Sequence, residues 1–182
     1  MMKNYQATWL RDCVQMMIVF VLLYLLCSFT TVNEGNTNEI TWRKLSYKDF
    51  TIKQSLDGIK VAESNTGISY ELVKGGRFQA TAIFEKDRSF ISAKLVSSKI
   101  DWIISHEQGH FDIAEIVTRR LNLRLNGVKD DRVADKLFTQ ALAELDAMQA
   151  LYDDETDHSE DHEAQNEWTL RFRGLLRSQA TK

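Results

Sequence analysis

The chain contains little cysteine and no proline, and the scarcity of cysteine limits its chemistry. Among 182 residues there are only two cysteines, Cys13 and Cys27, and both lie in or beside an apolar segment near the N-terminus. The rest of the chain therefore offers neither a disulfide nor a thiolate ligand. A metal bound there must use nitrogen and oxygen atoms. The absence of proline is unusual, and nothing in the sequence explains it.

Positive charge is also in short supply. The chain has 23 basic and 26 acidic residues and a net charge of −3, and without its first 33 residues the net charge is about −4. This balance argues against nucleic acid as a partner, because such binding needs a basic surface. No internal repeat is present. The roughly 145 residues that follow position 37 are enough for one domain with its own core.

A continuous apolar run without charge occupies residues 13–29. It is long enough for a signal peptide and close to the about 20 residues that span a bilayer. Lys3 and Arg11 precede it, so we expect a cytoplasmic N-terminus and an exported remainder, and the lack of a small-residue cleavage site favours an uncleaved anchor. The sequence predicts a signal peptide or transmembrane anchor with a short tether over residues 1–33. Residues 38–182 are then a domain on the exported side of the cell envelope, held by a single pass through the inner membrane.

The motif with the clearest chemistry is His106-Glu107-Gln108-Gly109-His110. Two imidazoles four residues apart on a helix point the same way and can hold one divalent metal. In zinc hydrolases with the H-E-x-x-H pattern, the glutamate is not a ligand and takes a proton from the metal-bound water. The pattern therefore predicts His106 and His110 as zinc ligands and Glu107 as a general base. The plain alternative is a helix with two surface histidines.

The surrounding pattern predicts an α+β fold. A long helix from about Ser98 to Gly127 would carry the motif, with the histidines on or beside its apolar face. Apolar stripes predict two more helices, one that continues to about Met148 and one that carries Trp168. Alternating apolar residues in three earlier segments predict a small antiparallel sheet, with hairpin-like turns between them. The expected order is thus a small antiparallel sheet followed by three helices, after a hydrophobic signal or anchor helix; the three strand segments are 68–73, 78–84 and 90–95.

Two imidazoles leave one protein ligand to find, because catalytic zinc sites commonly have three and keep a fourth position open. The remaining histidines, His158 and His162, lie in an acidic segment that precedes the last helix. His158 is the first choice, and carboxylates of the same segment are alternatives that spacing alone does not exclude, namely Asp154, Glu155 and Asp157. The segment can also be read as the solvated first turns of a helix, where negative charge is favourable.

Further motifs are spread along the chain: Leu45-Ser46-Tyr47-Lys48-Asp49-Phe50, Phe84, Ser89-Phe90, His106 to Asp112, Tyr152-Asp153, Glu155-Thr156, His158, Gln165 and Trp168. In this combination the chain after about residue 38 resembles the bacterial domain-of-unknown-function family 922, the predicted secreted zinc-dependent proteases. The resemblance implies that His158 is the third ligand and leaves His162 outside the motif. The chain departs from the family pattern at three positions, and none of them is a proposed ligand or base: Ser159 in place of glycine, Phe90 in place of tryptophan, and Tyr47 where tryptophan is frequent.

These assignments predict peptide hydrolysis. Zinc on His106, His110 and His158 would activate a water, Glu107 would accept its proton, and a peptide or protein would be the substrate. Two other side chains are candidates for stabilising the oxyanion or for the second shell of the site, although a structural role is more common for each: Tyr152 and His162. The competing functions are a non-catalytic, metal-stabilised envelope scaffold or binding domain, and a membrane-tethered interaction protein without metal.

Overall fold

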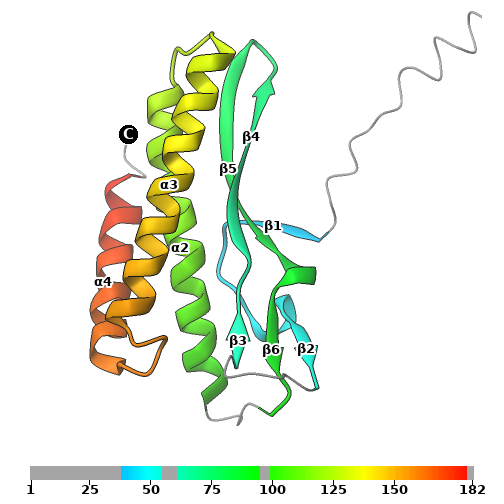
Figure 1. Ribbon diagram of the computed structural model, residues 1–182, viewed down its shortest axis with the longest axis vertical. Helices are drawn as coiled ribbons and strands as arrows, with labels where there is room; N and C mark the ends of the chain where they lie inside the picture. The colour runs from blue at the N-terminus through cyan, green and yellow to red at the C-terminus, as the bar shows by residue number, and fades with distance from the viewer. Residues whose placement is uncertain (1–37, 55–60, 95–98, 180–182) are drawn as a thin grey trace, which may run out of the picture. The chain divides into compact units, whose positions relative to one another are not determined.

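Strands occupy the first half of the described chain and helices the second, which confirms the predicted α+β class (Figure 1). The computed structural model describes residues 38–54, 61–94 and 99–179. The predicted signal or anchor over residues 1–33 lies outside these ranges. The strands are β1 (Glu39–Thr41), β2 (Thr51–Lys53), β3 (Ala62–Glu63), β4 (Thr66–Val73), β5 (Arg77–Glu85) and β6 (Phe90–Ser92), and the helices are α2 (Ile100–Leu125), α3 (Asp131–Glu155) and α4 (His162–Ser178).

The strands form two small sheets, where the sequence predicts one. In the first, with order β1-β5-β4, all pairing is antiparallel, and the β4–β5 hairpin turns at Gly75 and Gly76 with φ of 88° and 64°. Lys74–Gly76 form a three-residue loop, and the positive φ at its two glycines is a conformation that a residue without a Cβ atom adopts without strain. In the second sheet, β6 lies between β2, which is parallel to it, and β3, which is antiparallel.

The sequence pattern predicts that segment 90–95 pairs with β5 through a hairpin. The structure differs, because β6 pairs with β2 and β3 instead. A short 3-10 turn, Lys86–Arg88, follows β5, and the Ser89 hydroxyl then donates to the carbonyl of Glu85 and accepts from the backbone N–H of Asn65. These bonds redirect the chain away from β5. Among the described residues 90–94, Phe90–Ser92 form the strand, and it pairs with segments that precede β4 in the sequence.

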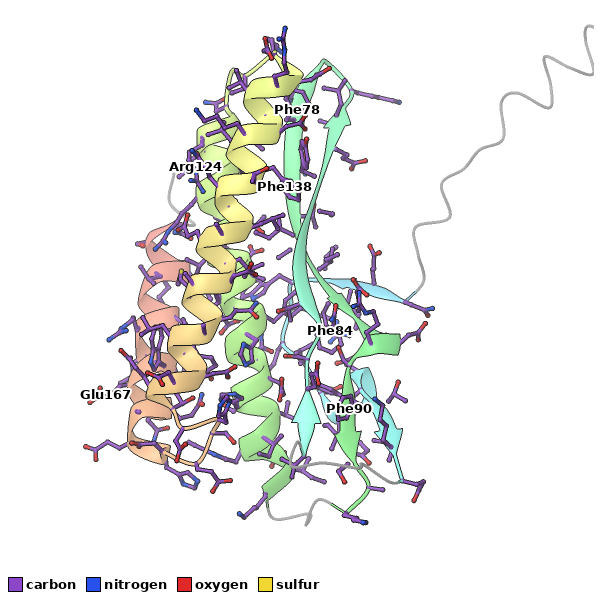
Figure 2. All side chains as sticks on the ribbon, in the orientation of Figure 1. Phe78, Phe84, Phe90, Arg124, Phe138 and Glu167 are labelled. Atoms are coloured by element: carbon purple, nitrogen blue, oxygen red, sulfur yellow. The ribbon has the colours of Figure 1, made fainter. Side chains whose placement is uncertain are left out.

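Helix α2 is the centre of the domain, because it contacts β4 and β5 on one side and both other helices on the other. Its buried apolar residues recur at helical spacing, as expected for a core helix, and Phe111 meets Phe84 of β5 with ring centroids 5.7 Å apart. Near the hairpin, Tyr70 of β4 lies between Phe78 of β5 and Phe138 of α3, with centroids 6.1 and 4.4 Å apart (Figure 2). The apolar layer between sheet and helices thus extends along α2 from Phe111 to Leu125, with Ile104 packed against it.

The side-chain amide of Asn122 hydrogen-bonds α2 to strand β5 of the sheet. The Asn122 side chain accepts from the N–H of Ala80 at 2.8 Å and donates to its carbonyl at 2.9 Å, as a neighbouring strand would. Strand β1 pairs with β5 only at residues 83–85, so Asn122 completes the hydrogen bonding of β5 beyond the end of β1. This contact sets the height of α2, and with it the height of the histidine motif, relative to the strands.

The ends of the helices follow the sequence signals. Gly127, with φ of 80°, follows α2, and the side chains of Asp130 and Asp161 accept from the first free N–H groups of α3 and α4. Such caps satisfy donors that the helix itself leaves without partners. Across the described ranges, none of the helices combines the length and the apolar character needed to cross a membrane.

Candidate metal centre

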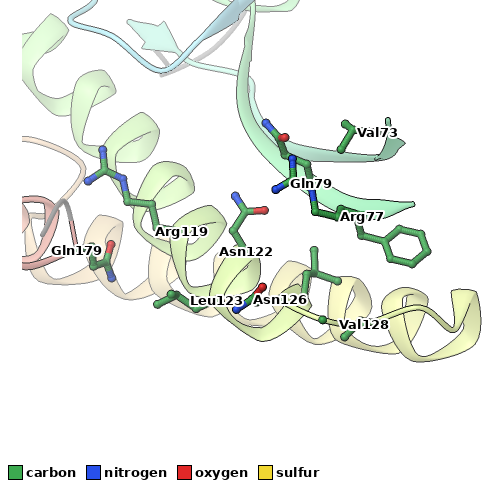
Figure 3. A pocket seen from close by; sticks show the side chains of 12 residues that line it. Val73, Arg77, Gln79, Arg119, Asn122, Leu123, Asn126, Val128 and Gln179 are labelled. Carbon is green, nitrogen blue, oxygen red and sulfur yellow. The ribbon is translucent and has the colours of Figure 1, made fainter. Parts of the chain in front are cut away.

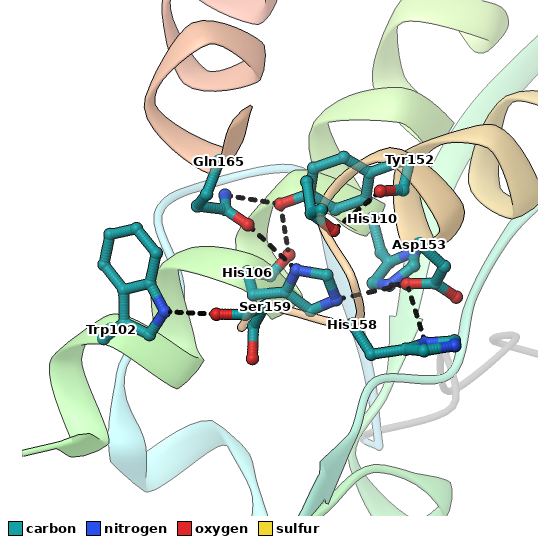
Figure 4. Close-up of polar contacts among 9 residues, drawn as sticks. Trp102, His106, His110, Tyr152, Asp153, His158, Ser159 and Gln165 are labelled. Atoms are coloured by element: carbon teal, nitrogen blue, oxygen red, sulfur yellow. Dashed lines mark hydrogen bonds and ion pairs between the residues drawn. The ribbon is translucent and has the colours of Figure 1, made fainter. Parts of the chain in front are cut away.

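The two histidines of the motif lie on the buried side of α2 and direct the same ring atom to one point. His106 and His110 are buried, their rings are perpendicular at 87°, and their centroids are 5.0 Å apart (Figure 4). The four-residue spacing on one helix face accounts for this arrangement. In both rings, Nε2 is the atom that approaches α3.

The third group at this point is a carboxylate. Oδ1 of Asp153, in the last turn of α3, lies 3.2 Å from Nε2 of His106 and 3.0 Å from Nε2 of His110. One ligand atom from each of the three residues lies within 4.8 Å of the others. Zinc bonds of about 2.0–2.2 Å in a tetrahedron place ligand atoms about 3.3 Å apart, so the spacing fits a zinc ion between them. Two imidazoles and a carboxylate also form a donor set that catalytic zinc commonly has.

Hydrogen bonds between the imidazoles and Asp153 shift the pKa values of His106 and Asp153. Burial lowers the pKa of His106, but the hydrogen bonds to Asp153 and Gln165 outweigh this effect and the pKa is raised overall. Burial acts on Asp153 to raise its pKa, and the hydrogen bonds from both imidazoles reverse the effect and hold it well below its usual range. Without a metal, the carboxylate is thus a fixed negative charge that attracts a cation to the two ring nitrogens.

These residues form part of the wall of a cavity of about 590 Å³. Glu107 lines the cavity beside the two histidines and is itself only 5% exposed. The edge strand β3 forms part of the opposite wall, through Ala62 and Glu63. A substrate in this cavity would meet the three metal-binding groups, the carboxylate of Glu107 and the edge of a strand.

Tyr152 lies behind His106 and does not line the cavity. It is fully buried, stacks on the His106 ring at 4.8 Å, and donates from its hydroxyl to the His106 carbonyl at 3.2 Å. Gly109 makes this position possible, because a Cβ atom there would lie 2.5 Å from the Tyr152 Cζ and closer still to the hydroxyl oxygen. The glycine within the motif is therefore explained by the close approach of α3 to α2.

The remaining predicted residues lie outside the group of three. His158 is in a turn of left-handed residues 157–159, its side chain is 78% exposed, and its Nδ1 is 3.8 Å from Oδ1 of Asp153. It lines the mouth of the cavity. His162 stacks on Trp102, with centroids 4.0 Å apart, at the start of α4. Of the acidic alternatives, Asp157 lines the cavity, whereas Glu155 accepts from Trp168 and Asp154 is exposed.

Sequence reasoning gave no role in the metal site to Asp153 and Gln165, although both belong to the motifs that carry the family resemblance. Asp153 follows a buried tyrosine and lies four residues after Gln149, which also lines the cavity. That helical spacing could have singled it out among the acids. Gln165, 1% exposed, accepts from Nδ1 of His106 at 2.9 Å and is a fully buried polar residue on an otherwise amphipathic helix. Nothing in its local sequence shows which histidine it reaches.

A second cavity, of about 420 Å³, lies between the β4–β5 hairpin and the C-terminal turns of α2 (Figure 3). Its polar side chains are largely engaged with the protein: Arg119 bonds to Glu115 and to the carbonyl of Leu176, and Asn122 bonds to Ala80. It holds none of the histidines or acids described above. The candidate functional site is therefore the cavity beside the histidine motif.

Comparison with known families agrees with this location. Residues 94–159 match the family described as "Bacterial protein of unknown function (DUF922)", which confirms the resemblance predicted from the sequence over this stretch. The match spans the histidine motif and Asp153 and ends just after His158, and it leaves Gln165 outside. The family description states no activity. The searches of curated proteins and of solved structures gave no match.

Proposed function

We propose that this protein is a zinc metallopeptidase of the bacterial envelope, with His106, His110 and Asp153 as the metal-binding residues and Glu107 as the general base. The observation that carries the proposal is the convergence of two Nε2 atoms and one carboxylate oxygen on one point in a cavity lined by Glu107. When bound, zinc would act as a Lewis acid that polarises the substrate carbonyl and lowers the pKa of a water molecule. The anchoring of residues 1–33 in the inner membrane, with the domain exported, is part of the proposal and rests on the sequence.

The residues of the chain have separate roles in this reaction. Glu107 takes the proton that the attacking water loses and returns it to the nitrogen of the leaving amine. Strand β3 stands last in the order β2-β6-β3 and lines the cavity, and we propose that an extended peptide binds along it. His158 is exposed at the cavity mouth, where its ring can donate to the carbonyl oxygen of a bound peptide.

The experiment measures zinc content and hydrolysis of a broad peptide library by the full chain in mild detergent. Glu107→Gln keeps the shape of the side chain and removes its basicity, so zinc binding should persist while the rate falls by about 10²–10⁴-fold. A wild type that holds zinc and cleaves nothing, or a glutamine variant as fast as wild type, would favour a non-catalytic scaffold.

The third ligand is tested by alanine variants of Asp153 and His158. The Asp153 variant should lose more zinc affinity than the about 10–100-fold that loss of an outer-shell partner costs. The His158 variant should keep most of its zinc and lose hydrolysis. If zinc affinity falls more for His158→Ala than for Asp153→Ala, the ligand set implied by the family resemblance is the correct one. His162→Ala is the matched control and should leave both quantities unchanged, because its ring packs on Trp102 outside the cavity.

A further inference from the structure

We infer that Tyr152 and Gln165 fix the His106 imidazole in the tautomer that keeps its hydrogen on Nδ1 and presents Nε2 to the metal. The inference rests on the metal site of the proposed function and assigns positioning roles to two residues that touch neither metal nor substrate. It follows from the direction of three successive hydrogen bonds (Figure 4).

The chain of bonds begins at a backbone carbonyl. The carbonyl oxygen of His106 can only accept, so the Tyr152 hydroxyl, 3.2 Å away, must donate its one hydrogen to it. The phenol keeps that hydrogen at neutral pH, because the ordinary pKa of a tyrosine is about 10. The other contact of the phenol oxygen, 2.6 Å from Nε2 of Gln165, is then a bond in which the amide nitrogen donates.

The direction of that second bond decides the third. With its nitrogen on Tyr152, the Gln165 amide turns its oxygen to Nδ1 of His106 at 2.9 Å. An amide oxygen only accepts, so Nδ1 carries a hydrogen. This is the hydrogen that a neutral ring retains while Nε2 binds a metal. A reversed amide would place its NH₂ group against Nδ1 and force the ring hydrogen onto Nε2, which would block that atom as a ligand.

The surroundings leave these groups little freedom. Tyr152 is fully buried and Gln165 is 1% exposed, and the phenol ring packs edge-on against Trp168 and Phe172 with centroids 5.5 and 5.4 Å apart. The second histidine differs, since Nδ1 of His110 is buried without a hydrogen-bond partner in the described part of the chain. The protein thus orients one metal ligand in advance and leaves the second to be oriented by the metal.

The test compares zinc affinities of full-chain variants by competition with a chromophoric chelator. Tyr152→Phe and Gln165→Met keep shape and remove one link of the chain each, and both should bind zinc about 10–100-fold more weakly. Gln165→Glu should stay within about threefold of wild type, because one carboxylate oxygen still accepts from Nδ1, and the phenol can turn its one hydrogen from the His106 carbonyl to the other carboxylate oxygen. Phe172→Leu removes packing from the same tyrosine without touching a hydrogen bond, and it should keep wild-type affinity.

A spectroscopic signature accompanies the affinities. In the zinc-loaded protein, NMR of the imidazole groups should show a slowly exchanging Nδ1–H on His106 in wild type and Gln165→Glu, and faster exchange in Gln165→Met. Equal losses of affinity in Phe172→Leu and Tyr152→Phe would overturn the inference, as would wild-type affinity in both Tyr152→Phe and Gln165→Met. These results can be obtained even if no peptide is cleaved, so a failure of the hydrolase proposal is distinguishable. A wild type that binds no zinc would overturn both the hydrolase proposal and the inference about the His106 tautomer.

Discussion

Replacing Gly109 by alanine tests whether α3 lies as close to the histidine motif as the structure has it. On helix propensity alone the change should stabilise α2 by about 1 kcal/mol. The new Cβ, however, would lie 2.5 Å from Cζ and 2.8 Å from Cε1 of the fully buried Tyr152. Overpacking of a core typically costs about 1–3 kcal/mol. Displacement of the phenol also breaks its bonds to His106 and Gln165, at about 1 kcal/mol each. We expect a net destabilisation of about 2–4 kcal/mol.

The assay is thermal unfolding of the metal-free full chain in mild detergent, followed by circular dichroism. For a domain of this size the expected fall in Tm is roughly 5–12 °C. Gly174→Ala is the matched control, because Gly174 is also a helical glycine, but a Cβ atom added to it would meet no atom of the described residues within 4 Å. This control should raise the stability by up to about 1 kcal/mol. If Gly109→Ala were as stable as Gly174→Ala, Tyr152 could not lie against α2 as described.

Two further predictions concern groups that hold the site in place. Asp49 is buried and accepts from Arg43 and from the backbone N–H of Ser46, the residue before the 3-10 helix Tyr47–Asp49. These bonds lower its pKa from 3.8 to about 2, so its charge stabilises the fold above pH 4 and this contribution is lost as the pH falls through 2. Asp49→Asn should therefore cost about 2 kcal/mol at pH 7 and little once the pH is well below 2, as measured by unfolding across pH; a constant difference would contradict this cause. Asn122→Ala leaves the N–H and carbonyl of Ala80 without their partner and should destabilise by about 1–3 kcal/mol, as measured by denaturant unfolding. Asn122→Asp keeps the acceptor but places a carboxylate oxygen against the Ala80 carbonyl, so at pH 7 it should not restore the lost stability.

The sequence by itself determined the elements that depend on local spacing. The four-residue interval places both imidazoles on one face of a helix wherever that helix packs, and Gly127 and the capping aspartates mark the helix ends. The glycine pair favours the β4–β5 hairpin for a similarly local reason, because the left-handed φ of Gly75 and Gly76 suits residues without a Cβ atom. The sequence therefore predicted strands followed by three helices and, of the three residues that converge in the candidate metal centre, the two histidines.

Only the tertiary structure decided what completes that centre. Asp153 is 47 residues from His106 and Gln165 is 59 residues away, and each belongs to a different helix. Many acids near position 153 satisfy the chemistry of a ligand, so composition does not select among them. The selection comes from packing: Tyr152 fits against the bare backbone at Gly109, and the carboxylate next to it then faces both imidazoles. Such a contact depends on how two helices approach each other, which no periodicity within either helix contains.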